Sequence, residues 1–342
     1  MVGERTLILA EGYSHDPHYG KTMRGVLRYR REDVVAIVDG ARAGDEHGGV
    51  PVVASVEEGL AHRPETALVG VATQGGRFPD AWREMLRQAV DAGLHLENGL
   101  HEFVRDDPVL APLAAARGVE IRDLRRTPAD LNVPTGENLE TPTRNVLTVG
   151  SDCALGKMTV ALELDRAARA RGLASQFVPT GQTGIAIAGW GISVDAVVAD
   201  FIAGAAEQLV VEGHRRGGEL LLVEGQGSLT HPAYSGVTLG LVHGSAPHVF
   251  VLCHKAETTE VDGYPGHPLM PLADLVRLHE LISLTRRKAR VACVAVNTHG
   301  LDEDRARAAI DAAAADTGLP ADDPVRYGAD ALLDATLAAL PS

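Results

Sequence analysis

The chain has 342 residues, of which 45% are hydrophobic and 23% are charged, and its net charge is −14. This is the balance of an ordinary globular protein, and the length exceeds what a single core usually supports, so about two domains are expected. The acidic excess disfavours binding to nucleic acid and to anionic membrane surfaces. An anionic ligand would therefore need a local cationic site.

The cysteines and the apolar segments bear on where the protein works. Cys153, Cys253 and Cys293 are odd in number and lack the spacing of metal ligands, so we expect neither a disulfide framework nor a zinc site, and a reducing cytoplasm fits best. No apolar segment of signal-peptide length follows Met1, and no apolar run approaches the roughly 20 residues needed to span a bilayer.

Short aliphatic segments alternate with longer Ala-, Leu-, Arg- and Glu-rich segments, which is typical of an α/β fold with parallel sheets flanked by helices. In the first part, strands are expected at Thr6–Ala10, Val34–Val38, Thr66–Val71, His95–Glu97 and Gly118–Leu124, with helices at Thr22–Tyr29, Val56–Ala61 and Asp80–Ala92. In the second part, strands are expected at Val146–Val149, Ala174–Val178, Glu219–Val223, His248–Leu252 and Val291–Val296, with helices at Lys157–Arg171, Val194–Arg215, Leu272–Thr285 and Asp304–Thr317.

The region between these two parts is rich in Arg, Pro, Thr and Asn over residues 125–144. We therefore predict a first α/β domain over residues 1–135 and a second over residues 136–342. Asp39 closes the second strand of the first domain, where Rossmann-type domains carry an acidic ribose ligand. The glycine fingerprint after the first strand is missing, so a solvent-exposed carboxylate at a strand end explains Asp39 equally well.

A glycine-rich loop joins the first strand of the second domain to its first helix. The loop contains, in order, Gly150, Ser151, Asp152, Cys153, Ala154, Leu155, Gly156, Lys157, Met158 and Thr159. In such loops, backbone amides beside a helix amino terminus bind phosphate oxygens and the lysine neutralises their charge. The magnesium-binding hydroxyl normally follows the lysine directly, but Met158 stands there, and Thr159 is one residue late. The loop predicts phosphate binding and leaves metal binding in doubt.

Further polar residues follow the predicted strands. Glu224 ends an apolar strand and opens a turn with two glycines, so it is a candidate magnesium ligand or general base. Thr180 and Gln182 belong to a small, hydroxyl-bearing loop, and Asp195 fits a catalytic role and a helix-capping role equally well. His254 and Lys255 are the best-placed pair for proton transfer among scattered histidines. Asn297 follows a strand where its amide could read the edge of a base.

The loop, the Glu224 turn and Asn297 resemble those of dethiobiotin synthetase, although Met158 replaces that family's threonine. A longer resemblance, over nearly the whole chain, is to a former family of unknown function that includes D-glutamate N-acetyltransferases. The segments that carry it are Tyr19–Thr22, Gly25, Arg28-Tyr29, Gly150–Thr159, Pro179–Gly184, Val223–Ser228 and His254-Lys255. This resemblance implies a Rossmann-like first domain, a P-loop NTPase-like second domain and an amino acid as acyl acceptor.

Two enzyme classes compete for this sequence. One is acetyl transfer from acetyl-CoA to an acidic, D-glutamate-like amino acid in D-amino-acid metabolism, with the loop holding the coenzyme's phosphates. Glu224 or a nearby histidine would take the amine proton, and Lys21, Arg24 or Arg28 would pair with the substrate carboxylates. The other is ATP- and Mg²⁺-dependent phosphoryl transfer or ligation, in which Lys157 neutralises the phosphate and Glu224 holds the metal. A non-catalytic nucleotide sensor is a third, less favoured reading.

The partners expected from these readings are small molecules. The reaction needs an amino acid or similar substrate, and nothing points to nucleic acid or to a membrane. Large acidic α/β proteins are often symmetric oligomers. A homo-oligomer is therefore expected from this general tendency.

Overall fold

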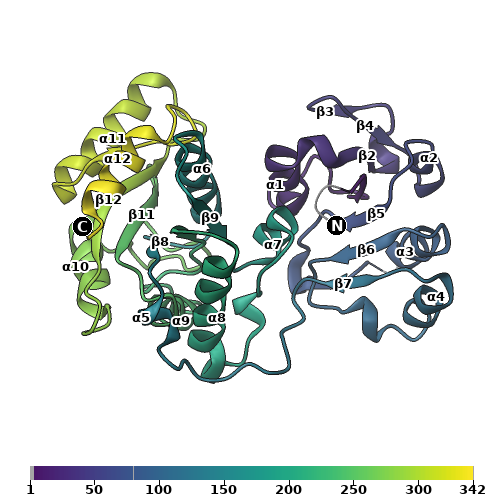
Figure 1. The fold of residues 1–342 in the computed structure, drawn as a ribbon. Helices are drawn as coiled ribbons and strands as arrows, with labels where there is room; N and C mark the ends of the chain where they lie inside the picture. Colours follow the sequence, from purple (N-terminus) through teal and green to yellow (C-terminus); the bar gives the residue numbers. More distant parts are fainter. Residues whose placement is uncertain (1–3, 80, 342) are drawn as a thin grey trace. The chain divides into compact units, whose positions relative to one another are not determined.

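The computed structural model describes residues 4–79 and 81–341, and the chain forms two compact units (Figure 1). The first unit holds the residues up to Thr127 together with Gly181–Ala196, and the second holds Pro128–Thr180 together with the residues from Val197 onward. Both units are α/β with largely parallel sheets, which confirms the predicted fold class. Among the described residues, no helix is both long and apolar enough to cross a membrane.

The first unit is built on a seven-stranded sheet in the order β3-β4-β2-β1-β5-β6-β7. Its pairings are parallel except for β3 with β4. The strands are β1 (Thr6–Leu9), β2 (Val34–Val38), β3 (Glu46–His47), β4 (Val50–Val53), β5 (Thr66–Val69), β6 (His95–Asn98) and β7 (Ile121–Asp123). The central strands β1 and β5 are buried throughout, which explains their continuous aliphatic sequences.

Helices connect these strands by crossovers. They are α1 (Lys21–Tyr29), α2 (Val56–Leu60), α3 (Trp82–Asp91) and α4 (Leu110–Arg117). The chain passes from β1 toward β2 through α1 and from β4 toward β7 through the other three helices. Because such crossovers are right-handed, α1 lies on one face of the sheet and the other three lie on the opposite face. Asp80, the first residue of the helix predicted over Asp80–Ala92, which corresponds to α3, lies outside the described residues.

The segment Gly181–Ala196 is the second contribution to the first unit, and it carries helix α7 (Gln182–Ala188). Helix α7 packs on α1, where the hydroxyls of Thr22 and Thr183 lie 3.0 Å apart. The Arg30 guanidinium donates to the carbonyl of Ala186, and that of Arg122 donates to the carbonyl of Gly189. Buried hydrogen bonds of charged donors are strong, so these contacts fix the segment to the first unit.

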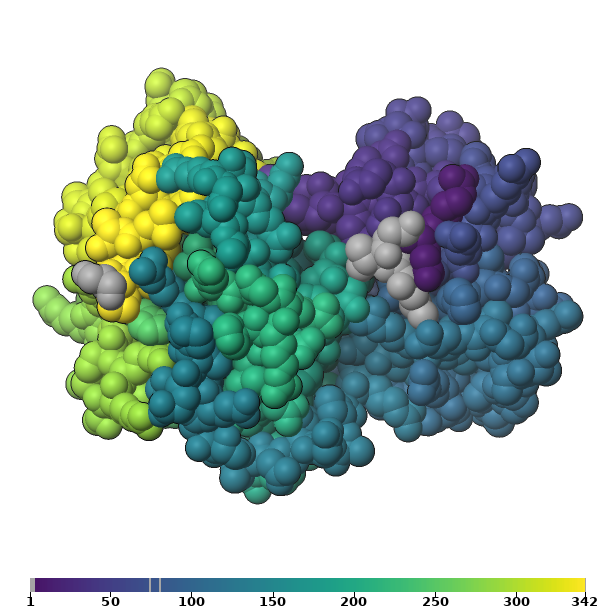
Figure 2. All heavy atoms as spheres, in the orientation of Figure 1, coloured from purple at the N-terminus to yellow at the C-terminus, as the bar shows by residue number. Residues whose placement is uncertain are grey.

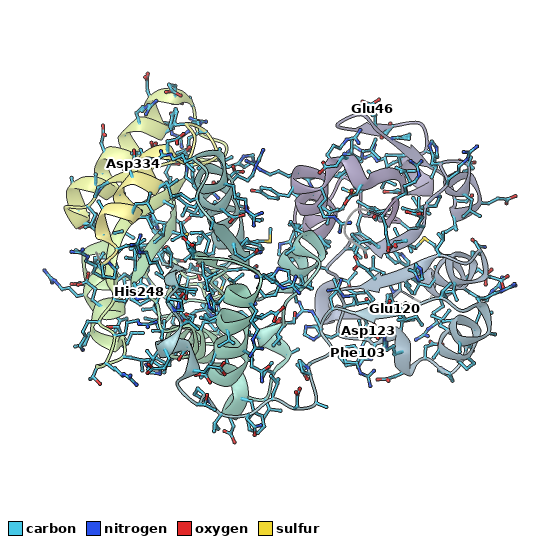
Figure 3. All side chains as sticks on the ribbon, in the orientation of Figure 1. Glu46, Phe103, Glu120, Asp123, His248 and Asp334 are labelled. Atoms are coloured by element: carbon cyan, nitrogen blue, oxygen red, sulfur yellow. The ribbon has the colours of Figure 1, made fainter. Side chains whose placement is uncertain are left out.

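The second unit is built on a six-stranded, fully parallel sheet in the order β13-β12-β11-β8-β10-β9. The strands are β8 (Arg144–Gly150), β9 (Ser175–Val178), β10 (Leu220–Val223), β11 (Val249–Lys255), β12 (Arg290–Asn297) and β13 (Ala321–Asp322). Figure 3 labels His248, just before β11, whose ring nitrogen accepts the Asn145 backbone N–H at 3.0 Å.

Helices cover both faces of this sheet. They are α5 (Glu137–Glu140), α6 (Lys157–Ala170), α8 (Ile202–Arg215), α9 (Ser235–Ser245), α10 (Leu272–Ile282), α11 (Glu303–Thr317) and α12 (Asp330–Ala339). Helices α6 and α12 pack together on one face, whereas α8 packs with α9 and α10 with α11 on the other. Residues of α11 and α12, yellow-green and yellow, form part of the outer surface of this unit (Figure 2).

One predicted helix is wrong in extent, and several elements were not predicted. The helix expected over Val194–Arg215 begins only at Ile202, after two 3₁₀ turns, because Val198 adopts an extended-like backbone with ψ 137°. Valine pairs such as Val197-Val198 disfavour continuous helix. The short strands β3, β4 and β13 and the helices α4, α5, α7, α9 and α12 had no sequence signal strong enough to predict them.

Candidate functional site

Polar groups of the second unit gather at the carboxyl edge of its sheet. The register pairs Gly150 with Cys253 and Lys255 with Asn297, so the ends of β8, β11 and β12 coincide. Glu224 follows directly after Val223, the last residue of β10, which lies beside β8. Open α/β sheets bind their ligands at this edge. The phosphate loop, Glu224, His254, Lys255 and Asn297 therefore share one edge.

The predicted phosphate loop lies between β8 and α6. Its backbone reverses through Ala154 (φ 52°) and Gly156 (φ 106°), and α6 begins at Lys157. Left-handed backbone at these positions lets successive amides turn toward one point beside a helix amino terminus. The Ser151 N–H donates to the carbonyl of Cys253 at 3.0 Å, so the first part of the loop is held to the neighbouring strand β11.

The Lys157 side chain runs back across the loop between two glycines. Its ammonium donates to the carbonyl of Asp152 at 2.7 Å. A Cβ at Gly150 would lie 2.9 Å from Lys157 Nζ, and a Cβ at Gly225 would lie 3.3 Å from its Cδ and only 1.6 Å from the carbonyl oxygen of Thr148. Side chains at either position would displace the lysine or the strand. The glycine after Glu224 is thus required by the close approach of the Thr148 carbonyl, and the Lys157 side chain passes beside it.

Burial lowers the pKa of the Lys157 ammonium from its ordinary value, because the side chain is only 6% exposed. The nearby Asp152 and Glu224 oppose this shift. A phosphate group placed at the loop would add negative charge beside the ammonium and favour its charged form. The Lys157 ammonium is therefore a buried cation whose charge a bound anionic ligand would neutralise.

Glu224 is buried and organises the turn around it. Its Oε2 accepts the backbone N–H of Thr180 at 2.8 Å, and its carbonyl accepts the Thr180 hydroxyl at 2.8 Å. The Gln226 amide donates to the carbonyl of Thr180 at 2.5 Å. This carboxylate fastens β9 to the turn after β10. The role of Glu224 as magnesium ligand or base stays a prediction. The same holds for magnesium binding by Thr159, which lies in the first turn of α6.

His254 joins the loop from the end of β11. Its Nδ1 lies 2.9 Å from the Ser151 hydroxyl. Burial lowers the pKa of His254 from its ordinary value. The imidazole is therefore neutral at neutral pH and able to accept a proton. Lys255, the next residue, is exposed.

Asp152, Cys153 and His231 form a close cluster in which one potential ligand atom of each lies within 4.8 Å of the others. The geometry does not suit a metal. His231 Nδ1 accepts the Ala233 N–H at 3.1 Å, so Nε2 carries the proton, whereas a metal-bound histidine donates from its second nitrogen. Burial raises the pKa of the Cys153 thiol to about 11, so it is protonated at neutral pH and a poor nucleophile.

The Asp152 carboxylate holds a second loop against the phosphate loop, and the sequence did not indicate this contact. Its Oδ2 accepts the Asp262 N–H at 2.7 Å, and its Oδ1 accepts the Cys153 N–H at 2.7 Å. The ring of His231 stacks on Tyr234 with centroids 4.7 Å apart and meets Tyr264 edge-on at 5.2 Å. These aromatic residues follow β10 and β11, a position that sequence reasoning could have examined.

Asn297 bonds the phosphate loop itself. Its Nδ2 donates to the carbonyl of Leu155 at 3.1 Å, and its Oδ1 accepts the His299 N–H at 3.0 Å. Both ends of the amide therefore bind backbone groups in this structure. Reading of a base edge by Asn297 stays a prediction.

Other predicted site residues lie in the first unit. Lys21, Arg24 and Arg28 are exposed on α1, where Arg24 donates to the carbonyl of His15 at 3.1 Å. Gln182 begins α7 and is buried, whereas Thr180 belongs to the second unit. Binding of substrate by these residues stays a prediction.

Two acids of the first unit have structural partners. Asp39 is 1% exposed and accepts hydrogen bonds from the Gly12 N–H at 3.2 Å and from the N–H and hydroxyl of Ser14 at 3.1 and 2.5 Å. A solvent-exposed strand-end carboxylate is therefore the wrong description, because Asp39 holds the loop after β1. Asp195 forms an ion pair with Arg125 at a 3₁₀ turn, so it does not cap an α-helix.

A Rossmann-like unit followed by a parallel sheet with a phosphate loop defines a two-domain P-loop protein. Family models agree with this class: the DUF1611_C P-loop domain matches residues 132–333, and the DUF1611_N Rossmann-like domain matches residues 38–127. The chain belongs to the DUF1611 family of proteins.

Relatives and a solved structure extend the match to nearly the full chain. A D-glutamate N-acetyltransferase of Tritonibacter scottomollicae is 37% identical over 98% of this chain and 99% of its own length. Another from a Pseudoalteromonas species is 32% identical over 79% of this chain and 80% of its own. The crystal structure of a DUF1611 family protein from Anabaena variabilis is similar with a TM-score of 0.91 and 41% identity, covering 98% and 99% of the two chains.

Proposed function

We propose that this protein is an N-acetyltransferase that moves the acetyl group of acetyl-CoA to the amine of an acidic amino acid such as D-glutamate. The observation that carries the proposal is the similarity to two proteins named D-glutamate N-acetyltransferase, over 98% of this chain for one and 79% for the other. The phosphate loop supports it, because coenzyme A has phosphates for Lys157 and the loop amides to bind. Met158 is consistent with a loop that binds phosphates without a hydrolytic magnesium site.

The reaction requires a base that accepts the amine proton and a cationic group that binds a substrate carboxylate. The substrate nitrogen attacks the thioester carbon, the new N–C bond forms, and the C–S bond breaks to release the coenzyme thiol. The imidazole of His254 is our candidate to accept the amine proton, because burial lowers its pKa and so leaves the ring unprotonated at neutral pH. Lys255 is exposed at the same strand end and is our candidate partner for a substrate carboxylate. Glu224 would position the turn through its bond to Thr180.

The direct test is product analysis with purified protein and D-glutamate, supplied with either acetyl-CoA or ATP and Mg²⁺. The proposal expects acetylated amine and free coenzyme thiol in the first reaction. Accumulation of ADP, without acetylated amine, would instead support the phosphoryl-transfer reading. L-Glutamate in a parallel reaction reports the preferred chirality.

A matched pair of histidine variants tests the base. His254→Gln should lower kcat by roughly 100-fold or more, the usual contribution of a positioned base. His214→Gln changes an exposed histidine in α8 and serves as the control. Wild-type kcat in His254→Gln would show that another group accepts the proton.

A further inference from the structure

A cavity of about 730 Å³ lies in the second unit beside the end of β11. Its walls come from the segment after β11, the start of α10 and one side of α11. Residues that line it include Thr258, Thr259, Met270, Leu272, Ala309 and Ala312. Small-molecule sites have this range of volume and this mixture of apolar walls with a few polar groups.

His254 links the cavity to the phosphate loop. It lines the cavity, and its Nδ1 lies 2.9 Å from the hydroxyl of Ser151 in the loop. A ligand whose phosphates bind at the loop therefore has this cavity next to its anchored end. The cavity and the loop belong to the same unit.

The cation among the residues lining the cavity is already paired, and the other charged side chains there are acids. Arg305 donates to Glu257 at 3.0 Å, and Asp316 accepts the Ala273 N–H at 3.3 Å. Burial lowers the pKa of His254, which is therefore neutral at neutral pH. A phosphate or carboxylate entering the cavity would meet no uncompensated cation, whereas an uncharged chain needs hydrogen-bond partners only for its amide groups.

The shape of the walls favours a slender chain over a flat ring. Apart from His254, the residues lining the cavity include no aromatic side chain on which a nucleobase could stack. Alanines of α11 line one wall, and Thr258 and Thr259, from the segment after β11, add two hydroxyl-bearing side chains to the lining. The aliphatic carbons of a bound chain would pack on the alanines, and its amide groups would hydrogen-bond to the threonine hydroxyls.

We infer that this cavity binds the uncharged, amide-bearing pantetheine arm of the acyl-coenzyme while the loop binds the phosphates. The inference rests on the proposed function and adds where the arm lies. It places the arm on the side of the sheet that α10 and α11 cover, next to His254.

Filling the cavity from α11 tests the inference. Ala312→Leu adds bulk on an exposed position that lines the cavity, and Ala315→Leu adds the same bulk on an exposed position of the same helix outside it. Leucine is a good helix former, so both variants should fold. Equilibrium binding is then measured for acetyl-CoA and for adenosine 3′,5′-bisphosphate, which has phosphates but no arm.

We expect Ala312→Leu to weaken acetyl-CoA binding roughly tenfold or more and to leave adenosine 3′,5′-bisphosphate binding unchanged, with Ala315→Leu like the wild type for both. If Ala312→Leu and Ala309→Leu bind acetyl-CoA as the wild type does while the wild type acetylates D-glutamate, the cavity assignment is overturned and the proposed function stands. If the wild type neither binds acetyl-CoA nor forms acetylated amine, both are overturned.

Discussion

Replacing Gly225 by alanine should destabilise the second unit, because the new side chain would clash with strand β8. The added Cβ would lie 1.6 Å from the Thr148 carbonyl oxygen, about half the separation that such a contact needs, and 3.3 Å from Lys157 Cδ. Strand β8 or the turn after β10 must then shift by roughly 1 Å or more. This shift would break the 2.9 Å hydrogen bond from the Gly225 N–H to the Thr148 hydroxyl. Overpacking with a lost buried hydrogen bond costs about 3 kcal/mol or more.

The assay is thermal unfolding, and the control is Gly236→Ala. A loss of about 3 kcal/mol should lower the Tm of the second unit by roughly 6–12 °C. Gly236 lies in α9 with nothing within 4 Å of an added Cβ, so alanine there should stabilise by about 0.5–1 kcal/mol. Equal Tm values for the two variants would contradict the clash expected at Gly225.

Three further predictions concern stability and the loop. Burial lowers the pKa of His279 and of His248 to about 4, below the unfolded value of about 6.5. The free energy of unfolding should therefore fall as the pH drops from about 6.5 to about 4. Denaturant titrations that give the same free energy of unfolding at about pH 4.5 as at neutral pH would contradict this. Asn297→Ala removes the bond to the loop and should weaken binding of the phosphate-bearing ligand by roughly threefold to tenfold in calorimetric titration. Glu207→Ala removes the acceptor of the Thr135 and Gly136 N–H groups and should cost about 2 kcal/mol in denaturant unfolding, with an unaltered midpoint as the contrary result.

The local features of the second unit could be predicted from the sequence. The phosphate loop has its glycines and lysine within ten residues, between a strand and a helix that both have clear patterns. Glu224, His254 and Asn297 follow predicted strands, and parallel strands end at one edge of a sheet. The contacts that depend on register, such as Lys157 passing between Gly150 and Gly225, could not be predicted without knowing which strands pair.

Helix α9 shows why some elements could not be predicted. Its sequence contains Gly236, Gly240 and Gly244, which locally favour a loop. In the structure a Cβ on Gly240 would lie 2.4 Å from Ile202 Cγ2, and one on Gly244 would lie 2.0 Å from the Ala203 carbonyl. The glycines therefore allow α9 to approach α8 closely. This tertiary reason for glycine outweighs its low helix propensity.

The segment Gly181–Ala196 had no sequence signal for joining the first unit. Its partners, among them Thr22, Arg30 and Arg122, are between 67 and 161 residues away along the chain. Asp39 is similar, since its bonds to Gly12 and Ser14 depend on how the loop after β1 folds back. Long-range hydrogen bonds of this kind have no periodic or compositional signature.

We propose that the loop at Gly150–Thr159 binds the phosphates of the acyl-coenzyme. Calorimetric titration of acetyl-CoA into the wild type and into Lys157→Ala tests it most directly. Loss of a charge-assisted contact should weaken binding by roughly 10- to 100-fold. Equal affinity in the two proteins would contradict the claim.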